Sequence, residues 1–487
     1  MNKYIFAVSI VLSLAGCTTT PKLETNSLKS ISKENNMLTK KYDYNLFQRQ
    51  NWWKNSQDQN LNLLIEEILS NNSQIKIAKM NVEKALASIQ EAKRANISSV
   101  DLVGSGKKTY IDNKYTKIDN KYMEAKLPIN DLKHTETLDQ GAIGLQAGYV
   151  IDLWGKFKAL EQESQYAKEA QELQSKWITL NISTSVADIY GKYILLNNES
   201  NILKEKSEIA EKLYSLEKIR YNSGLGDEAS VLNIENSCRE LKNAIKSVEN
   251  NKQILKNTLL VLNNSQNSEV ITSVLKNIDE NKNYKFSKFM NTPEGIDSDL
   301  IVNRPDVEYY LKVIDSQKEK LKSIKADYYP RITLTGSFQY HTLDVQSLIE
   351  AESTLLSIGP SLYLPLFNRN SLNQKYKMAG MDVNIFIEEY NNNLIKAYQD
   401  VNNNLASLKV SDSTLESQNK NLKNSEKIFS NNETLYGVGN ISNYQLLQSK
   451  LSYLNDKLKN SEKEYDVYSQ QINLINSLGG YYKEQVK

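Results

Sequence analysis

The chain has 487 residues, and its 60 basic and 58 acidic residues leave a formal charge of only +2. This balance provides no extended basic surface for DNA or RNA, so a nucleic-acid partner is excluded. Only 7 prolines and 18 glycines occur, which indicates a few long secondary-structure elements rather than many short ones.

The N-terminal residues have the pattern of an export signal. Lys3 precedes an apolar run from Ile5 to Leu12, which is too short to span a membrane. The sequence Leu14-Ala15-Gly16-Cys17 resembles the bacterial lipobox, in which the cysteine becomes the acylated first residue of a lipoprotein. Residues 1–16 are therefore expected to be a signal peptide, and residues 17–50 an acylated, extended leader. Thr18, rather than Asp, follows the cysteine, and in bacterial lipoproteins this implies sorting to the outer membrane. The alternative is an ordinary cleaved signal peptide with an incidental cysteine.

The sequence offers no catalytic or metal-binding motif. Cys238 is the only cysteine after Cys17, and His134 and His341 are the only histidines, so no metal-ligand cluster is expected. There is no glycine-rich phosphate loop and no nucleophile elbow. The sequence therefore predicts neither an enzyme nor a cofactor.

Helical and strand-like patterns follow one another from residue 51. Apolar residues recur at helical spacing from Leu61 to Ala95, which predicts one amphipathic helix. Alternating residues then predict strands at Ile97–Ile111 and Gly141–Leu153, the second with one apolar face and one small or polar face. Each strand has the length and alternation of a membrane β-barrel strand, although the edge of a soluble sandwich would alternate in the same way.

A very long helix is predicted from Trp154 to Tyr221. Its 68 residues correspond to a rod of about 100 Å, and its heptad-like apolar spacing indicates lateral packing against other helices. A glycine turn at Asn222–Gly226 ends it, and a returning helix to about Asn263 completes an antiparallel hairpin.

The same succession of elements is predicted again after a polar connection over residues 264–298. The second set is expected to comprise a helix, two strands, a second long helix, a glycine turn and a returning helix. The helix is expected at Asp299–Tyr328, the strands at Pro330–His341 and Leu355–Leu366, and the long helix from Asn368 to a break at Tyr436-Gly437-Val438-Gly439. Leu153 and Leu366 are 213 residues apart, and Tyr221 and Tyr436 are 215 apart. This agreement predicts an internal duplication, with structural repeats at residues 51–263 and 299–487.

Four strands cannot close a barrel by themselves. A bacterial outer-membrane barrel needs at least about eight strands, and an open edge in lipid would leave backbone groups unpaired. Closure must therefore come from further copies of the chain. A trimer would supply twelve strands, although the count does not choose three copies over two or four.

Several short motifs together resemble the outer-membrane efflux proteins of the TolC family, in particular the lipoprotein branch that serves drug and metal efflux pumps. They are Trp52-Trp53 with Leu61-Asn62-Leu63-Leu64-Ile65, Ile151-Asp152-Leu153-Trp154-Gly155-Lys156, Arg220-Tyr221-Asn222-Ser223-Gly224-Leu225-Gly226, Asn303-Arg304-Pro305-Asp306-Val307, Tyr329-Pro330-Arg331-Ile332, Gly359-Pro360-Ser361-Leu362-Tyr363-Leu364-Pro365-Leu366-Phe367 and Leu478-Gly479-Gly480-Tyr481-Tyr482. Each is weak alone, but their order and spacing over nearly the whole mature chain are specific.

The resemblance implies a mainly α fold with membrane β-strands. It implies a homotrimer whose 12-stranded β-barrel, in the outer membrane of a Gram-negative bacterium, continues into a 12-helix α-barrel across the periplasm. Such a protein is the passive export duct of a tripartite efflux system, with outer-membrane lipid, a periplasmic adaptor and an inner-membrane transporter as its partners. A lipid-anchored scaffold or tether without a pore is the alternative. The cargo stays open among drugs, metal ions, metabolites and polypeptides.

The resemblance also implies functional residues at the two hairpin ends. The adaptor would dock at the tips formed by Gly224, Leu225, Val438 and Gly439, although the glycines could equally serve only to permit a tight helix end. Ser230, Tyr436, Gln445 and Gln448 would lie at the periplasmic aperture. Relatives often carry aspartates where Ser230 and Gln445 stand, so a carboxylate-gated, cation-selective aperture is not expected. Asp227 and Glu228 are interpreted as helix N-terminal charges.

Overall fold

The structure is a computed structural model that describes residues 20–29, 51–111, 136–296, 298–342, 354–365 and 368–480. The expected signal peptide and Cys17 lie outside the described residues. The chain divides into two compact units. Unit 1 contains Met1–Thr25, Ala85–Ala167 and Ile314–Ile385, and unit 2 contains Asn26–Lys84, Lys168–Val313 and Phe386–Lys487.

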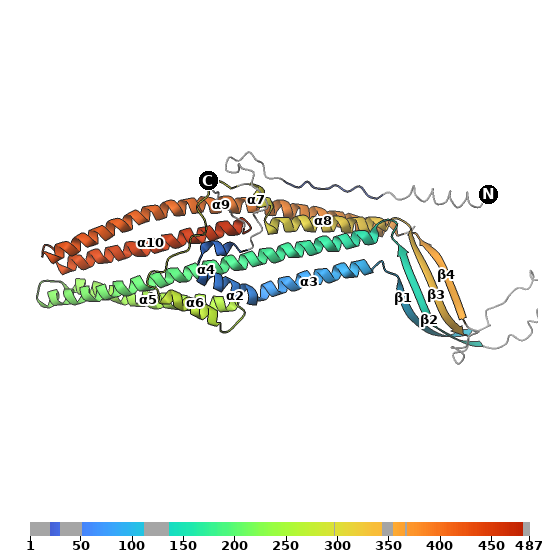
Figure 1. The fold of residues 1–487 in the computed structure, drawn as a ribbon, viewed down its shortest axis with the longest axis horizontal. Helices are drawn as coiled ribbons and strands as arrows, with labels where there is room; N and C mark the ends of the chain where they lie inside the picture. The colour runs from blue at the N-terminus through green and yellow to red at the C-terminus, as the bar shows by residue number, and fades with distance from the viewer. Residues whose placement is uncertain are drawn as a thin grey trace, which may run out of the picture. The chain divides into compact units, whose positions relative to one another are not determined.

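Unit 1 contains a four-stranded antiparallel sheet with the strands in sequence order (Figure 1). The strands are β1 (Ser99–Ile111), β2 (Glu136–Ile151), β3 (Arg331–Thr342) and β4 (Thr354–Tyr363). All four strands that the alternation predicted are therefore confirmed, with ends shifted by a few residues. β2 pairs with β3 although about 180 residues of chain separate them, so the two halves of the sequence meet in one sheet.

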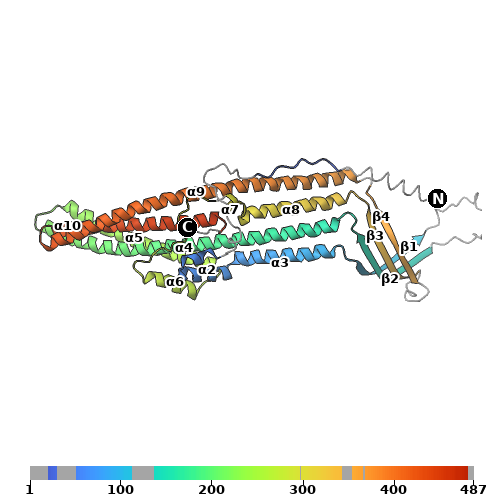
Figure 2. The same cartoon turned by 45° about the horizontal axis from the view of Figure 1, so that its top comes forward.

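Unit 1 contains segments of four helices: α3 (Ser73–Arg94), α4 (Lys156–Asn222), α8 (Pro305–Ala326) and α9 (Arg369–Gly437). These segments lie beside one another in the order of the strands to which they are joined (Figure 2). Lys93 on α3 pairs with Glu161 on α4, and Ser316 on α8 donates a hydrogen bond to the Glu163 carbonyl on α4. The helices thus form a single layer in this unit.

Unit 2 contains two antiparallel helical hairpins (Figure 1). α4 turns into α5 (Glu228–Leu262), and α9 turns into α10 (Asn443–Ser477). Leu196, Leu203 and Val248 join α4 to α5, whereas Ile202, Ile209 and Leu213 pack on Leu447 and Leu454 and so join α4 to α10. The two long helices contain 67 and 69 residues and the two returning helices 35 each, as the predicted hairpins required. Within the described ranges, no helix has an apolar stretch long enough to cross a membrane.

The helix predicted over Leu61–Ala95 is in fact two helices. α2 (Gln59–Asn71) and α3, which begins at Ser73, are separated by one residue, Asn72. Asn72 has an extended ψ of 129°, and its side-chain oxygen accepts hydrogen bonds from the backbone amides of Gln74 and Ile75. Asparagine is a preferred N-cap, so this residue starts a new helix where the apolar periodicity alone indicated continuity.

Two further helices modify the predicted connection and the predicted second repeat. α6 (Glu269–Asp279) lies within the connection and buries Ile271, Val274, Leu275 and Ile278, partly against α2. The helix predicted over Asp299–Tyr328 is divided into α7 (Ser298–Val302) and α8, because Pro305 occupies the first helical position, where its missing N–H costs nothing.

Replacing Gly191 with alanine is expected to destabilise unit 2 by about 1–3 kcal/mol. A Cβ atom there would overlap the ring of Tyr468, which is 1% exposed and donates a hydrogen bond from its hydroxyl to the Ala187 carbonyl at 2.8 Å. The urea midpoint of the helical circular-dichroism signal would measure the loss. Combining Gly191→Ala with Tyr468→Leu should recover part of it, and a strictly additive double variant would argue against the overlap.

Candidate channel wall and hairpin tips

One face of the sheet is apolar across all four strands. Leu102, Leu145, Phe338 and Leu356 are successive cross-strand partners, so their side chains form one row from β1 to β4. A second row contains Val100, Ala147, Gly336 and Ile358. Leu356 and Ile358 are 75% and 80% exposed. A soluble protein rarely exposes so large a continuous apolar surface, and a lipid-facing strand must do so.

The other face of the same sheet is mostly polar or small, with Val103, Val150 and Leu355 as the large apolar exceptions among the described residues. Asp101, Gln146, Ser337 and Ser357 form the row between the two apolar rows, and the hydroxyls of Ser337 and Ser357 lie 2.7 Å apart. Because side chains alternate strictly between faces, one sheet has two surfaces suited to two different solvents. Among the described residues β1 and β4 each pair on one side only, so the sheet has two open edges.

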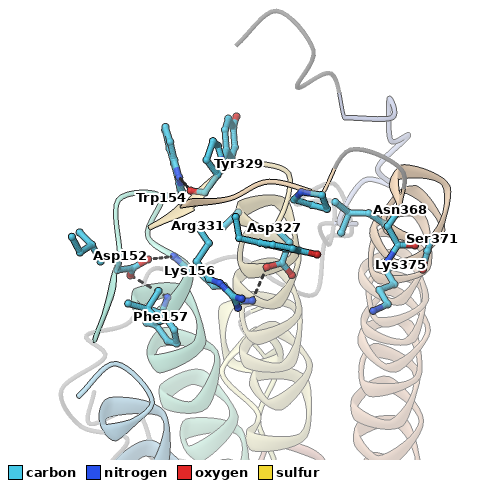
Figure 3. Close-up of a pocket in the computed structure, with 17 residues that line it drawn as sticks. Asp152, Trp154, Lys156, Phe157, Asp327, Tyr329, Arg331, Asn368, Ser371 and Lys375 are labelled. Atoms are coloured by element: carbon cyan, nitrogen blue, oxygen red, sulfur yellow. Dashed lines mark hydrogen bonds and ion pairs between the residues drawn. The ribbon is translucent and has the colours of Figure 1, made fainter. Parts of the chain in front are cut away.

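The junctions where strands meet helices are tied together in unit 1 (Figure 3). The Trp154 indole stacks on Tyr329 with ring centroids 4.6 Å apart and donates a hydrogen bond to the Pro330 carbonyl at 2.8 Å. Lys156 in the first turn of α4 pairs with Asp327 just after α8, with 2.6 Å between nitrogen and oxygen. The residues that make these contacts line a cavity of about 220 Å³. The contacts hold the junction of β2 and α4 against the junction of α8 and β3.

Asp152 begins α4 in an unusual way. Its carboxylate accepts hydrogen bonds from three successive backbone amides, those of Lys156, Phe157 and Lys158, at 2.7–3.1 Å. A carboxylate at this position satisfies amides that have no partner within the helix and interacts favourably with the positive end of the helix dipole. The Ile151–Lys156 motif therefore encodes the change from strand to helix.

The two hairpin tips have the same backbone geometry. Gly224 and Gly439 have φ angles of +71° and +79°, which side chains disfavour. At each tip the glycine amide donates to the carbonyl three residues before it, and the next amide to the carbonyl five residues before. Leu225 is 74% exposed and Val438 is 67% exposed, so each tip presents an apolar side chain to its surroundings.

The predicted aperture residues prove to be helix-capping or exposed residues. Asp227 caps α5: its carboxylate accepts bonds from the amide and the hydroxyl of Ser230, both at 2.8 Å, and the amide bond chiefly holds the pKa of Asp227 below its usual range. Ser442 and Gln445 form a reciprocal capping box at the start of α10. Asp227 and Ser442 are 215 residues apart in the sequence, and so are Ser230 and Gln445. Ser230 and Gln445 therefore occupy equivalent positions, three residues after the N-cap of their helices.

The other two predicted aperture residues are exposed. The Tyr436 side chain is 43% exposed at the end of α9, and Gln448 donates a hydrogen bond from its amide to the Tyr444 hydroxyl at 3.3 Å. Within the described part of the chain, no group of three or more His, Cys, Asp or Glu side chains could hold a metal ion. Sequence reasoning missed Asp152 as a three-amide cap; a carboxylate just before Trp154-Gly155 was the available signal.

The chain is similar in sequence and fold to known outer membrane proteins. The chain is 22% identical to the probable outer membrane lipoprotein SilC of Salmonella typhimurium, over 99% of both chains. It is 21% identical to the solvent efflux pump outer membrane protein SrpC of Pseudomonas putida, over 86% of this chain and 84% of that one. Its fold matches the Campylobacter jejuni CmeC outer membrane channel with a TM-score of 0.75 at 21% identity, over 95% of each chain.

The family model described as "Outer membrane efflux protein" matches residues 64–264 and 297–480. The matched segments contain the four strands, both hairpins and both tips. The chain therefore belongs to the outer membrane efflux protein family.

Proposed function

We propose that the chain is the channel subunit of a tripartite efflux system, and that three copies close one pore. The single observation that carries this proposal is the two-faced sheet with two open edges. In lipid each open edge would leave backbone groups unpaired at several kcal/mol apiece, so β1 of one copy must pair with β4 of another. A trimer gives twelve strands with the apolar rows outside and the polar row lining a water-filled path.

The equal lengths of corresponding elements support an internal duplication. α3 and α8 have 22 residues each, and α5 and α10 have 35 each. Two equivalent hairpins per subunit would give twelve helices in a trimer, enough to continue the pore as an α-barrel through the periplasm. Acylation of Cys17 would attach the leader to the outer membrane.

The exposed tips support docking of a periplasmic adaptor, which would connect the duct to an inner-membrane transporter. A tether without a pore would need neither the polar row nor the open edges. The named relatives include a solvent pump component, and the described polar row of the sheet does not distinguish solvents from drugs, metals, metabolites or polypeptides as the cargo.

Purified protein in a planar lipid bilayer tests the pore. Discrete conductance steps, together with trimer-sized migration of unheated protein in a detergent gel, are expected. Because Ser230 and Gln445 are capping residues rather than a carboxylate ring, the pore should be only weakly cation-selective. Protein that migrates as a monomer and gives no conductance would support the tether.

Replacing Gly224 or Gly439 with tryptophan is expected to abolish efflux while trimers still insert. A bulky residue at a positive φ distorts the tip backbone and occupies the surface next to Leu225 or Val438. Drug accumulation in cells and trimer content of the outer membrane are the two measurements. Gly437→Ala is the control, because Gly437 lies two residues before Gly439, lacks a positive φ and has open space around it. Efflux at the wild-type level from the tryptophan variants would refute the docking role.

A further inference from the structure

The cavity at the junctions of unit 1 is lined by side chains from the polar face of the sheet (Figure 3). Arg331 on β3 and Tyr363 on β4 are cross-strand partners, and both line this cavity. Arg331 lies six residues before Ser337, and Tyr363 lies six residues after Ser357, so strict alternation places both on the face of the polar row. In the proposed channel this face lines the water-filled path, and the cavity is therefore part of the duct wall.

The charged side chains around the cavity leave two cations available to a ligand. Five charged residues line it: Asp152, Lys156, Asp327, Arg331 and Lys375. Both carboxylates already have partners, because three backbone amides donate to Asp152 and the Lys156 ammonium lies 2.6 Å from Asp327. Neither Arg331 nor Lys375 forms an ion pair or a side-chain hydrogen bond with any described residue. Two positive charges therefore remain to attract an anion.

The two cations are arranged for an oxyanion. The Arg331 guanidinium lies 5.3 Å from the centroid of the Tyr363 ring. A guanidinium that stacks on a ring keeps its N–H groups free to make two parallel hydrogen bonds to a carboxylate, sulfonate or phosphate. Lys375 shares one stripe of α9 with Asn368 and Ser371, which also line the cavity at the N-terminal end of that helix. The positive end of the helix dipole adds to the attraction of the two side chains for an anion.

Apolar surface adjoins the cations. Phe157, Pro365 and Leu372 line the same cavity, together with the Tyr363 ring. The cavity volume of about 220 Å³ corresponds to about seven water molecules, so it accommodates a small molecule or one end of a larger one. Its lining is complementary to an oxyanion that is attached to an apolar body, and less so to a fully hydrated inorganic anion.

We propose that Arg331 and Lys375 form a binding station for organic anions on the wall of the duct. This inference rests on the proposed channel function and deepens it, because it assigns a preferred class of cargo to one point of the path. In a trimer three stations would lie where the strands meet the helices. Each station binds weakly, since a conducting path must also release what it binds.

Block of single-channel current by naphthalene-2-sulfonate tests the station in a planar bilayer. The probe should interrupt the potassium chloride current through wild-type trimers in proportion to its concentration. Combining Arg331→Gln with Lys375→Gln should raise the concentration for half block about tenfold, and Lys375→Gln alone should give part of this effect. Lys377→Gln is the matched control, because Lys377 is exposed on the same helix but does not line the cavity. Equal block of the double variant and the wild type would overturn the proposal.

Two analogues of the probe separate its charge from its apolar body. The neutral 2-naphthol and inorganic sulfate should each block wild-type channels at least about tenfold more weakly than naphthalene-2-sulfonate. Equal block by 2-naphthol would show that the cations recognise nothing, and equal block by sulfate would show that the apolar surface plays no part. Either result would overturn the assignment to organic anions.

Arg331→Lys separates the fork geometry from the charge. It should keep the wild-type reversal potential in a salt gradient but lose part of the block, because an ammonium cannot make two parallel hydrogen bonds. The double variant should instead shift the reversal potential toward cation selectivity. A double variant with both the wild-type reversal potential and the wild-type block would contradict the station.

Failure of the station can be distinguished from failure of the channel. Wild-type protein that gives no conductance steps would overturn the channel and the station together. Conducting trimers in which the block ignores both substitutions would overturn the station alone. Helical circular dichroism and trimer migration equal to those of the wild type show that the variants are folded.

Discussion

Replacing Arg304 with methionine is expected to lower the free energy of unfolding of unit 2 by about 3 kcal/mol, because it leaves the carboxylate of Asp306, whose side chain is only 13% exposed, without its cation. Arg304 is 3% exposed, and its guanidinium makes two parallel hydrogen bonds to Asp306, at 2.9 and 3.0 Å. It also donates to the Ser477 carbonyl at 2.9 Å and lies 5.3 Å from the centroid of the Trp177 ring. One side chain therefore joins the start of α8, the end of α10 and α4.

The measurement is the urea midpoint of the helical circular-dichroism signal of the protein in detergent. Arg304→Lys should give an intermediate loss, since an ammonium keeps the charge but cannot bond both carboxylate oxygens in the planar geometry of arginine. Arg304→Met combined with Asp306→Leu should be less damaging than Arg304→Met alone, because it also removes the unpaired carboxylate. A loss below about 1 kcal/mol for Arg304→Met would show that Asp306 finds other partners.

Arg304 also shows where sequence reasoning stops. Pro305 and Asp306 at a helix start are an ordinary capping pattern, and the structure has both in that role. Nothing local indicates that the preceding arginine contacts α10, because its partner Ser477 is 173 residues away. Trp52 and Trp53 present the same difficulty: the sequence identifies them as part of a motif, but only the structure shows that they are buried, at 5% and 3% exposure.

The elements that could be predicted from the sequence are those in which apolar residues recur at a regular spacing. The four strands were found because alternate residues face two solvents, and the hairpins because apolar spacing stops at glycines with positive φ. Membership of the outer membrane efflux protein family confirms the predicted transport role and the predicted absence of enzymatic activity. The helix break at Asn72 and helix α6 were missed, because one capping side chain and one short helix change the period too little.

In the structure residues 20–29 lie against α9, where Asn391 donates a hydrogen bond to the Ser27 carbonyl and accepts one from the Lys29 amide. This contact of the leader could not be predicted for a different reason. Residues 20–29 have no periodicity, and the asparagines that hold them look like ordinary polar positions of a helix surface. Only the structure shows that Asn391 is buried beneath the leader. Polar side chains that bond to backbone recognise a path of the chain and not its side chains, so they leave little trace in the partner's sequence.

Replacing Ile358 with lysine is expected to prevent formation of membrane-inserted trimers, whereas Ser357→Lys should leave them intact. The two residues are adjacent on β4, so their side chains point to opposite faces of the sheet. Ile358 is 80% exposed in an apolar row near the middle of the strand, where a lysine facing lipid costs about 2–4 kcal/mol per copy. Ser357 belongs to the polar row, where water would solvate the new ammonium.

Comparing these two variants distinguishes a channel from a tether without a pore. For Ile358→Lys, unheated protein from outer-membrane fractions should migrate as monomer and be open to protease. For Ser357→Lys, trimers should persist, and three added positive charges along the pore should shift the reversal potential in a salt gradient toward anion selectivity. If lysine is tolerated equally at both positions, the sheet does not face lipid on its apolar side. If Ser357→Lys alone fails, the faces are assigned the wrong way round, because only a lipid-facing position should reject the charge.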